Sequence, residues 1–255
     1  MKKNLLKSVW QNGKVVVNGW LSIPSGFSAE VMAHQGYDSL TVDLQHGMQD
    51  FQSALQCFQA ISTTTVVPLV RVPWLEPSIV MKCLDAGAYG VVCPLVNTRQ
   101  DAEKFVSYCR YPPIGERSYG PNRVMLYAGS DYADQADAEI LTIAMIETPE
   151  AIQNLDAILA TPGLDAVYVG PADLALAFGL RPSFEPTEPR LVEAFEKVVA
   201  AAHRHGKIPG IHTGSGAYAI KMAKMGYRFI TVSNDARLLA SAASAGVKTL
   251  REGLA

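Results

Sequence analysis

The chain has 255 residues, of which 49% are apolar and 18% are charged, and its formal net charge at pH 7 is −2. This composition supplies one large core, at a length that suits either a single (β/α)8 barrel or two small domains. The near-neutral charge argues against a nucleic-acid-binding surface, and no Lys/Arg run indicates a polybasic membrane patch. No apolar stretch reaches the roughly 18 residues of a membrane span.

Short β-branched apolar runs alternate with segments in which apolar residues recur at helical spacing. The runs fall at 15–23, 39–43, 66–72, 90–93, 141–147, 165–169, 208–212 and 229–233. Glycines that suit a left-handed helix end precede four of them: Gly36, Gly87, Gly206 and Gly226. Eight such units predict an α/β fold, a (β/α)8 TIM barrel forming one domain over residues 1–255. An open doubly wound sheet is the alternative, but no G-x-G-x-x-G follows the first strand.

Two segments interrupt this alternation. Residues 111–139 are rich in Pro, Gly and Tyr, and we expect a long loop there rather than a helix. The second segment, 178–189, contains three prolines and is also expected to be a loop. Long ordered loops in a compact domain usually serve function.

Two carboxylates lie at or just past the C-terminal ends of predicted strands. Glu147 closes the fifth strand and Asp173 follows the sixth. A carboxylate at the end of a buried strand is costly unless something pairs with it, and two on consecutive strands indicate a hard divalent cation. The alternative is that each is a helix N-cap or first-turn acid, because both precede helix-like segments.

Other polar side chains collect at the same predicted end of the barrel, where such barrels carry their chemistry. The second strand ends at Asp43 and is followed by His46, the third ends near Arg71, and the seventh contains His212. Taken singly, His46 is expected to be a loop histidine bonded to Asp43, Arg71 the structural partner of either acid, and His212 a core or rim histidine.

Taken together, these residues suit the chemistry of a 2-oxo acid. Two oxygen ligands leave coordination positions open on Mg²⁺ or Mn²⁺, which a chelating 2-oxo acid and water can fill, and the metal then acts as a Lewis acid on an enolate. Arg71 can neutralise the enolate oxygen or the carboxylate, and His46 can transfer a proton to or from an aldol hydroxyl. No lysine ends a strand, which argues against a Schiff base.

At these residues the chain resembles the HpcH/HpaI family of class II, metal-dependent pyruvate aldolases. The matching pieces follow the family order over nearly the whole chain. They are Val-Asp-Leu-Gln-His-Gly (42–47), Pro-Leu-Val-Arg-Val-Pro (68–73), Leu-Asp-Ala-Gly-Ala-Tyr-Gly (84–90), Pro-Leu-Val-Asn-Thr (94–98), Gly-Glu-Arg-Ser-Tyr-Gly-Pro (115–121), Met-Ile-Glu-Thr (145–148) and Val-Gly-Pro-Ala-Asp-Leu (169–174).

The resemblance implies a role for each matching residue. Glu147 and Asp173 would bind Mg²⁺ or Mn²⁺, with Co²⁺ or Zn²⁺ as further options. His46 would be the acid/base residue, Arg71 the enolate-stabilising residue, and Asp43 a partner near His46. Gly170 and Ala172 would contact the substrate carboxylate through the backbone, and Asp85 would reach a neighbouring subunit's site. Family members are hexamers of paired barrels that exchange the last helix, and the apolar tail at 236–250 is compatible with this.

Two positions depart from the family pattern. Many relatives carry Glu where this chain has Gln45, and Gln where it has Met145, a substrate-contact position two residues before Glu147. The loss of that amide alters how the 2-oxo acid is held. The chain is most similar to the hydroxyketoacid aldolases that accept pyruvate or hydroxypyruvate, which share Ala-Met-Ile-Glu-Thr.

The leading hypothesis is therefore a lyase that reversibly cleaves 4-hydroxy-2-oxo acids to pyruvate, or hydroxypyruvate, and an aldehyde. One alternative is a lyase of the phosphoenolpyruvate mutase or isocitrate lyase type, for which Cys93 is the candidate reactive residue. Another is a metabolite-binding barrel without turnover.

The cysteines and the first residues bear on the compartment. The four cysteines show no CxxC pair or zinc-like spacing, and we expect buried thiols in a reducing environment. The start, Met-Lys-Lys-Asn-Leu-Leu, is not a signal peptide, because Lys7, Gln11 and Asn12 interrupt any apolar region. A cytoplasmic protein is expected.

Overall fold

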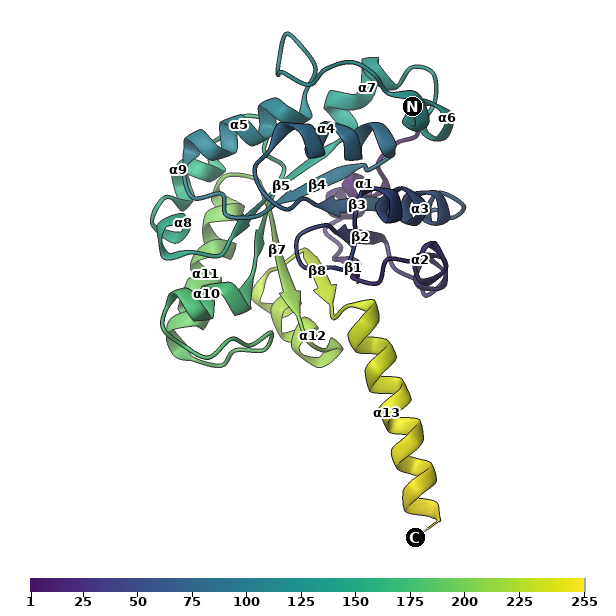
Figure 1. The fold of residues 1–255 in the computed structure, drawn as a ribbon. Coiled ribbons are helices and arrows are strands. Elements are labelled where there is room, and N and C mark those ends of the chain that lie inside the picture. Colours follow the sequence, from purple (N-terminus) through teal and green to yellow (C-terminus); the bar gives the residue numbers. More distant parts are fainter. Residues whose placement is uncertain (255) are drawn as a thin grey trace.

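Eight parallel strands close into one barrel in the computed structural model, which describes residues 1–254. Each strand pairs with its neighbours in chain order, and β8 pairs with β1 (Figure 1). The strands are β1 (Val16–Leu21), β2 (Ser39–Asp43), β3 (Val67–Arg71), β4 (Gly90–Cys93), β5 (Leu141–Ile146), β6 (Ala166–Val169), β7 (Ile208–Thr213) and β8 (Phe229–Val232). The predicted TIM barrel is confirmed, and every predicted strand falls within about two residues of its observed bounds.

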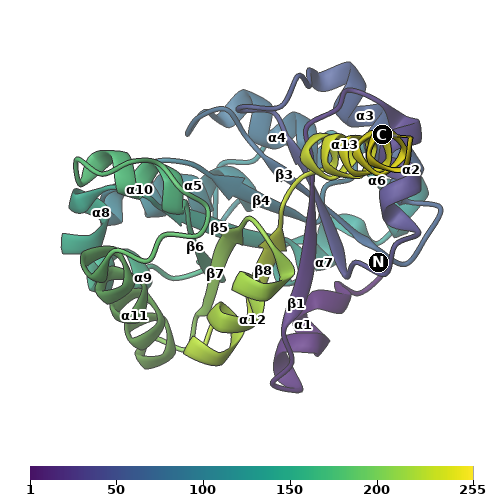
Figure 2. The same cartoon turned by 90° about the horizontal axis from the view of Figure 1, so that it is seen from below.

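Helices alternate with the strands, and all but the last lie around the barrel (Figure 2). They are α1 (Leu5–Gln11), α2 (Gly26–Ala33), α3 (Phe51–Ile61), α4 (Pro77–Ala86), α5 (Arg99–Cys109), α6 (Asn122–Ala128), α7 (Tyr132–Glu139), α8 (Pro149–Gln153), α9 (Leu155–Leu159), α10 (Pro171–Ala177), α11 (Pro189–Arg204), α12 (Gly216–Met225) and α13 (Asp235–Gly253). No helix among residues 1–254 is long and apolar enough to cross a membrane.

The local sequence explains where these helices begin and end. Pro77 and Pro189 occupy first helical positions, where the missing N–H costs nothing. Helix α4 buries Val80, Cys83 and Leu84, the apolar stripe of its sequence, and ends at Gly87, whose φ of 118° favours glycine. Gly36, Gly206 and Gly226 also have positive φ, as predicted.

The prediction of one long loop over residues 111–139 is wrong. The segment contains α6 and α7, separated by Gly129 at φ 122°. The cluster of Pro and Gly ends at Pro121, and the residues after it bury Val124 and Tyr132 against the barrel. Helices this short form because their apolar side chains pack, not because of intrinsic propensity. The second predicted loop, between α10 and α11, is confirmed.

Helix α13 projects away from the barrel (Figure 1). Of its residues only Asp235 is buried, and Leu239 and Leu250 are each 64% exposed. A shallow apolar groove lies on the outside of the barrel between β1, β8 and α12, where Val17 is 40% and Ile220 59% exposed. The helix that follows the last strand of a TIM barrel normally covers this part of the sheet, so α13 leaves it open.

Candidate active site

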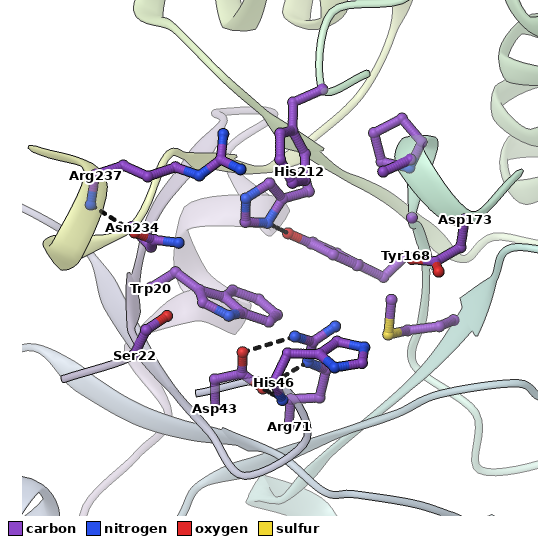
Figure 3. Close-up of a pocket in the computed structure, with 15 residues that line it drawn as sticks. Trp20, Ser22, Asp43, His46, Arg71, Tyr168, Asp173, His212, Asn234 and Arg237 are labelled. Atoms are coloured by element: carbon purple, nitrogen blue, oxygen red, sulfur yellow. Dashed lines mark hydrogen bonds and ion pairs between the residues drawn. The ribbon is translucent and has the colours of Figure 1, made fainter. Parts of the chain in front are cut away.

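A cavity of about 300 Å³ opens at the carboxyl ends of the strands (Figure 3). Most residues that the sequence singled out line it, which confirms that strand-end side chains meet there. They are Asp43, His46, Arg71, Met145, Gly170, Ala172 and Asp173. Glu147 lies directly beside this wall, and Asp85 lies elsewhere.

Asp43 and Arg71 form a buried, bidentate ion pair. Arg71 Nε donates to Asp43 Oδ1 at 2.8 Å, and its Nη2 donates to Oδ2 at 2.7 Å. The two residues are register partners on β2 and β3, which explains why their side chains meet. Burial alone would raise the pKa of Asp43, but the Arg71 guanidinium holds it below its ordinary value. Arg71 also lies 4.9 Å from the Trp20 ring, so its plane is fixed from two sides.

His46 presents an exposed imidazole to the cavity. Its backbone N–H donates to Asp43 Oδ1 at 3.2 Å, but its ring forms no hydrogen bond within residues 1–254. The expectation that the His46 side chain is bonded to Asp43 is therefore wrong, because Arg71 occupies that carboxylate. Arg71, in turn, pairs with Asp43 and not with Glu147 or Asp173. The imidazole is free to contact a molecule in the cavity.

Glu147 follows β5 and is 3% exposed. Its Oε1 accepts from the Leu95 N–H at 2.8 Å, and Leu95 adopts a φ of 54°, which is unusual for a residue other than glycine. Its pKa is raised to about 7, mainly by burial and further by the nearby Asp173. Asp173 is a first-turn acid of α10, as the alternative expects, but its side chain forms no capping hydrogen bond.

Glu147 and Asp173 fit a hard divalent cation. Glu147 is buried and Asp173 is exposed, the two carboxylates repel one another, and neither forms an ion pair within residues 1–254. Their oxygen atoms suit Mg²⁺ or Mn²⁺. The residues that the structure describes contain no group of three or more His, Cys, Asp and Glu able to hold a metal ion.

Gly170 lets the β6–α10 turn approach Glu147 closely. A Cβ at this position would lie 2.6 Å from Glu147 Oε2 and 3.2 Å from Met145 Cε. Met145 is 2% exposed and lines the cavity with its thioether, a weak acceptor. At the other departure from the family pattern, the buried Gln45 Oε1 has no hydrogen-bond partner in the described part of the chain.

Aromatic residues also line the cavity, and their position within strands rather than at strand ends hides them in the sequence. Trp20 stacks on Tyr168 with ring centroids 5.7 Å apart, and the Tyr168 hydroxyl lies 3.2 Å from His212 Nδ1. Burial, together with the charge of Arg71, lowers the pKa of His212 to about 3. His212 is thus a neutral histidine at the cavity, which agrees with the expectation of a core or rim histidine. In a sequence, aromatic residues within strands look like core residues. Only the alternation of side chains along a strand, which turns every second one toward the barrel interior, could have identified Trp20 and Tyr168 as cavity residues.

Asp85 does not line the cavity of its own chain. It lies near the C-terminal end of α4 and accepts from Arg117 Nη2 at 2.7 Å. Arg117 is fully buried and also donates to the Tyr132 hydroxyl at 2.9 Å. Within one subunit, the pair links α4 to α7.

The chain matches the family model of HpcH/HpaI aldolase/citrate lyase over residues 19–242. It is 41% identical over 241 residues to the hydroxypyruvate/pyruvate aldolase of Rhizorhabdus wittichii, covering 94% of this chain and 96% of that one. It is 34% identical over 251 residues to the 4-hydroxy-2-oxo-heptane-1,7-dioate aldolase of Salmonella dublin, covering 95% and 93%. A solved HpcH/HpaI aldolase/citrate lyase family protein from Burkholderia cenocepacia superposes with a TM-score of 0.92 at 32% identity, covering 98% and 100%.

Proposed function

The chain belongs to the HpcH/HpaI aldolase/citrate lyase family, and we propose that it is a divalent-metal-dependent carbon–carbon lyase of the class II aldolase type. The reaction is the reversible aldol cleavage of a 4-hydroxy-2-oxo acid to pyruvate, or hydroxypyruvate, and an aldehyde. The names of the relatives support this reaction. The observation that carries it is one cavity flanked by the unneutralised carboxylates Glu147 and Asp173 and lined by Arg71 and His46.

Glu147 and Asp173 would hold the cation, Mg²⁺ or Mn²⁺. When bound, the cation would supply Lewis-acid polarisation of the 2-oxo acid. Gly170, the N-cap of α10, and Ala172 lie beside these carboxylates on the cavity wall. We assign the backbone here to the substrate carboxylate, because N–H groups in a first helical turn lack intrahelical partners.

Arg71 stabilises negative charge as it develops on the 2-oxo acid. Asp43 engages Nε and Nη2, so Nη1 has no hydrogen-bond partner within residues 1–254. A guanidinium held by a carboxylate and an aromatic ring needs little rearrangement to donate to an oxyanion. Asp43 is therefore a positioning residue that acts through Arg71.

His46 accepts and returns the proton. In the cleavage direction it takes the proton of the C4 hydroxyl, the C3–C4 bond breaks, and C4 becomes the aldehyde carbonyl. The bond electrons pass to the enolate of the 2-oxo acid, and a proton added to C3 completes the pyruvate methyl group. An exposed imidazole at the cavity without another hydrogen-bond partner in the described residues suits this proton exchange.

Chemistry that relies on a reactive cysteine is disfavoured. Cys93 is fully buried, and burial raises its pKa well above the ordinary value of a thiol. A nucleophilic cysteine needs the opposite shift.

The test is turnover of 4-hydroxy-2-oxo acids by chelated protein to which Mg²⁺, Mn²⁺ or Co²⁺ is restored, together with exchange of the pyruvate methyl protons followed by NMR. We expect both activities to need the metal, and Glu147→Ala to abolish them. Glu150→Gln, on the neighbouring helix α8 and outside the cavity, is the matched control. Metal-independent activity in Glu147→Ala would refute the ligand assignment, and wild-type protein without exchange would refute the aldolase.

We also propose that the chain acts as one barrel domain and assembles as a hexamer, a trimer of dimers that exchange α13. The exposed leucines of α13 and the open apolar groove between β1, β8 and α12 support the exchange. Asp85 would face a neighbouring subunit's site in this assembly. Leu250→Lys should lower the molar mass measured by light scattering, whereas Lys248→Ala, on the same helix, should not; equal masses would argue against exchange.

We further propose a cytoplasmic location. The four cysteines, Cys57, Cys83, Cys93 and Cys109, are all buried and unpaired, as expected of a reducing compartment.

A further inference from the structure

Three polar side chains form a corner of the cavity across from Asp173 (Figure 3). Ser22 lies in the loop after β1, and Asn234 and Arg237 lie at the N-cap and in the first turn of α13. We refer to Ser22, Asn234 and Arg237 as the donor corner. The donor corner comes from segments at the two ends of the chain, and none of its residues has a role in the aldol steps proposed for Arg71, His46, Glu147 and Asp173.

Arg237 brings an unneutralised positive charge to the donor corner. No carboxylate in residues 1–254 forms an ion pair with its guanidinium, which instead lies over the Phe184 ring at 4.4 Å. Stacking on an aromatic face leaves the N–H groups at the edge of the guanidinium plane available. A planar guanidinium with two free N–H groups along one edge binds a carboxylate through two parallel hydrogen bonds.

Asn234 and Ser22 add donors beside it. Asn234 Oδ1 accepts from the Arg237 backbone N–H at 2.8 Å, so the amide oxygen is occupied and the Nδ2 group remains. Neither Asn234 Nδ2 nor the Ser22 hydroxyl has a hydrogen-bond partner in the part of the chain that the structure describes. The donor corner therefore offers several N–H and O–H groups and no free acceptor carboxylate.

The neighbouring acid, Asp235, fixes the donor corner but does not neutralise it. Asp235 is 4% exposed, and its carboxylate accepts from the Ser22 N–H at 2.8 Å, the Ile23 N–H at 3.2 Å and Ser28 Oγ at 3.0 Å. These bonds join the loop after β1 to the start of α13. The Asp235 carboxylate thus holds the two halves of the donor corner together without lining the cavity itself.

We propose that the donor corner binds an anionic group of the aldehyde, a carboxylate, and that Arg237 is the residue that determines this preference. The inference rests on the proposed aldolase reaction. Because Glu147 and Asp173 lie at the opposite side, the 2-oxo acid occupies that side and the aldehyde extends toward the donor corner. A cavity of about 300 Å³ is at the small end of ligand sites, so the aldehyde is short.

The experiment compares succinic semialdehyde with butyraldehyde, an aldehyde of the same chain length without the carboxylate, as acceptors for pyruvate. We expect the wild type to show a higher kcat/KM for the carboxylated aldehyde. In Arg237→Gln the ratio of the two kcat/KM values should fall by roughly 10- to 100-fold, the effect of losing hydrogen bonds to a charged group. Arg237→Lys keeps the positive charge but loses the planar pair of N–H donors. Its ratio of kcat/KM values should therefore lie between those of the wild type and Arg237→Gln.

Arg190→Gln is the matched control. Arg190 also stacks on a phenylalanine, Phe178, at 4.5 Å, but lies outside the cavity. The ratio should stay at the wild-type value in this variant. A ratio that is equally unchanged in Arg237→Gln, or that falls equally in Arg190→Gln, would overturn the proposal.

Two further arms separate the possible failures. A comparison of glyceraldehyde 3-phosphate with glyceraldehyde tests whether the donor corner prefers a phosphate to a carboxylate. If Arg237→Gln lowers the ratio of kcat/KM values more for this pair than for succinic semialdehyde and butyraldehyde, the choice of a carboxylate is overturned. Calorimetric titration of succinate in the presence of pyruvate tests the donor corner without turnover, and Arg237→Gln should weaken binding at least 10-fold. If the wild type lacks metal-dependent exchange of the pyruvate methyl protons, the aldolase proposal fails. If this exchange occurs but Arg237→Gln changes neither the ratio of kcat/KM values nor the affinity for succinate, only the proposal for the donor corner fails.

Discussion

Replacement of Asp43 by Asn separates the structural from the catalytic contribution of the Asp43–Arg71 pair. Asp43 is 2% exposed and Arg71 8% exposed, so the substitution leaves an almost buried guanidinium without its counter-charge. Removal of one partner from a buried ion pair costs about 3–5 kcal/mol, and the adjoining cavity, which lets water reach Arg71, favours the lower value of about 3 kcal/mol. The Asn amide can also direct its NH₂ group at Arg71, which adds a donor–donor conflict.

Thermal unfolding followed by circular dichroism measures the effect. For a chain of this size 1 kcal/mol shifts Tm by roughly 2–4 °C, so Asp43→Asn should melt about 6–12 °C below wild type. Asp156→Asn is the matched control, because Asp156 accepts from Arg204 at 2.8 Å while the two side chains are 61% and 58% exposed. An exposed pair contributes less than about 1 kcal/mol.

The double variant Asp43→Asn/Arg71→Met completes the test. If the unpaired guanidinium is the cause of instability, removal of its charge should restore part of the lost stability, and the double variant should melt above Asp43→Asn. The reasoning is refuted if Asp43→Asn and Asp156→Asn lose the same stability, or if Asp43→Asn retains wild-type kcat although Arg71 has lost its anchor.

Three other changes probe the cavity. Glu147→Gln should leave the metal-free protein at least as stable as wild type, since the pKa of about 7 reports an unfavourable buried charge, while cation binding by calorimetry falls more than roughly 100-fold; a clear loss of stability would contradict this. Gly170→Ala should weaken cation binding by roughly 1–3 kcal/mol, because its Cβ would lie 2.6 Å from Glu147 Oε2, whereas Gly216→Ala, with no atom within 4 Å, should not. His212 has a folded-state pKa of about 3 against 6.5 when unfolded, so the unfolded chain takes up the proton first and stability is lost as pH falls below 6.5. Urea unfolding at pH 7 and pH 5 should show a loss of roughly 2 kcal/mol that is absent in His212→Asn; parallel losses in both proteins would rule out His212 as the cause.

The barrel could be predicted because its signal is repeated. Eight apolar runs at regular intervals fix both the strands and their parallel order, and the carboxyl ends of parallel strands meet at one end of a closed sheet. This geometry alone brings Asp43, Arg71 and Asp173 to one cavity, as expected. The α6 and α7 helices escaped prediction because Pro and Gly dominate the first part of 111–139, and packing rather than propensity forms the helices that follow.

Contacts between side chains could be predicted less well. The register of β2 against β3 makes Asp43 the neighbour of Arg71, and nothing in either strand alone reveals that register. The donor corner was missed for another reason. Arg237 follows the last strand within a helix that the resemblance assigned to assembly, so its first turn was not considered part of the cavity.

Helix α13 connects the cavity to the periphery of the molecule. It spans 19 residues, or about 28 Å at the rise of an α-helix. Its first turn carries Arg237 while the rest lies clear of the barrel (Figure 1). If α13 moves as a rigid body, a small tilt of its outer turns also displaces the Arg237 guanidinium in its first turn. If Arg237 selects the aldehyde as proposed, substitutions in the outer turns that shift the helix are expected to change selectivity without contacting the substrate.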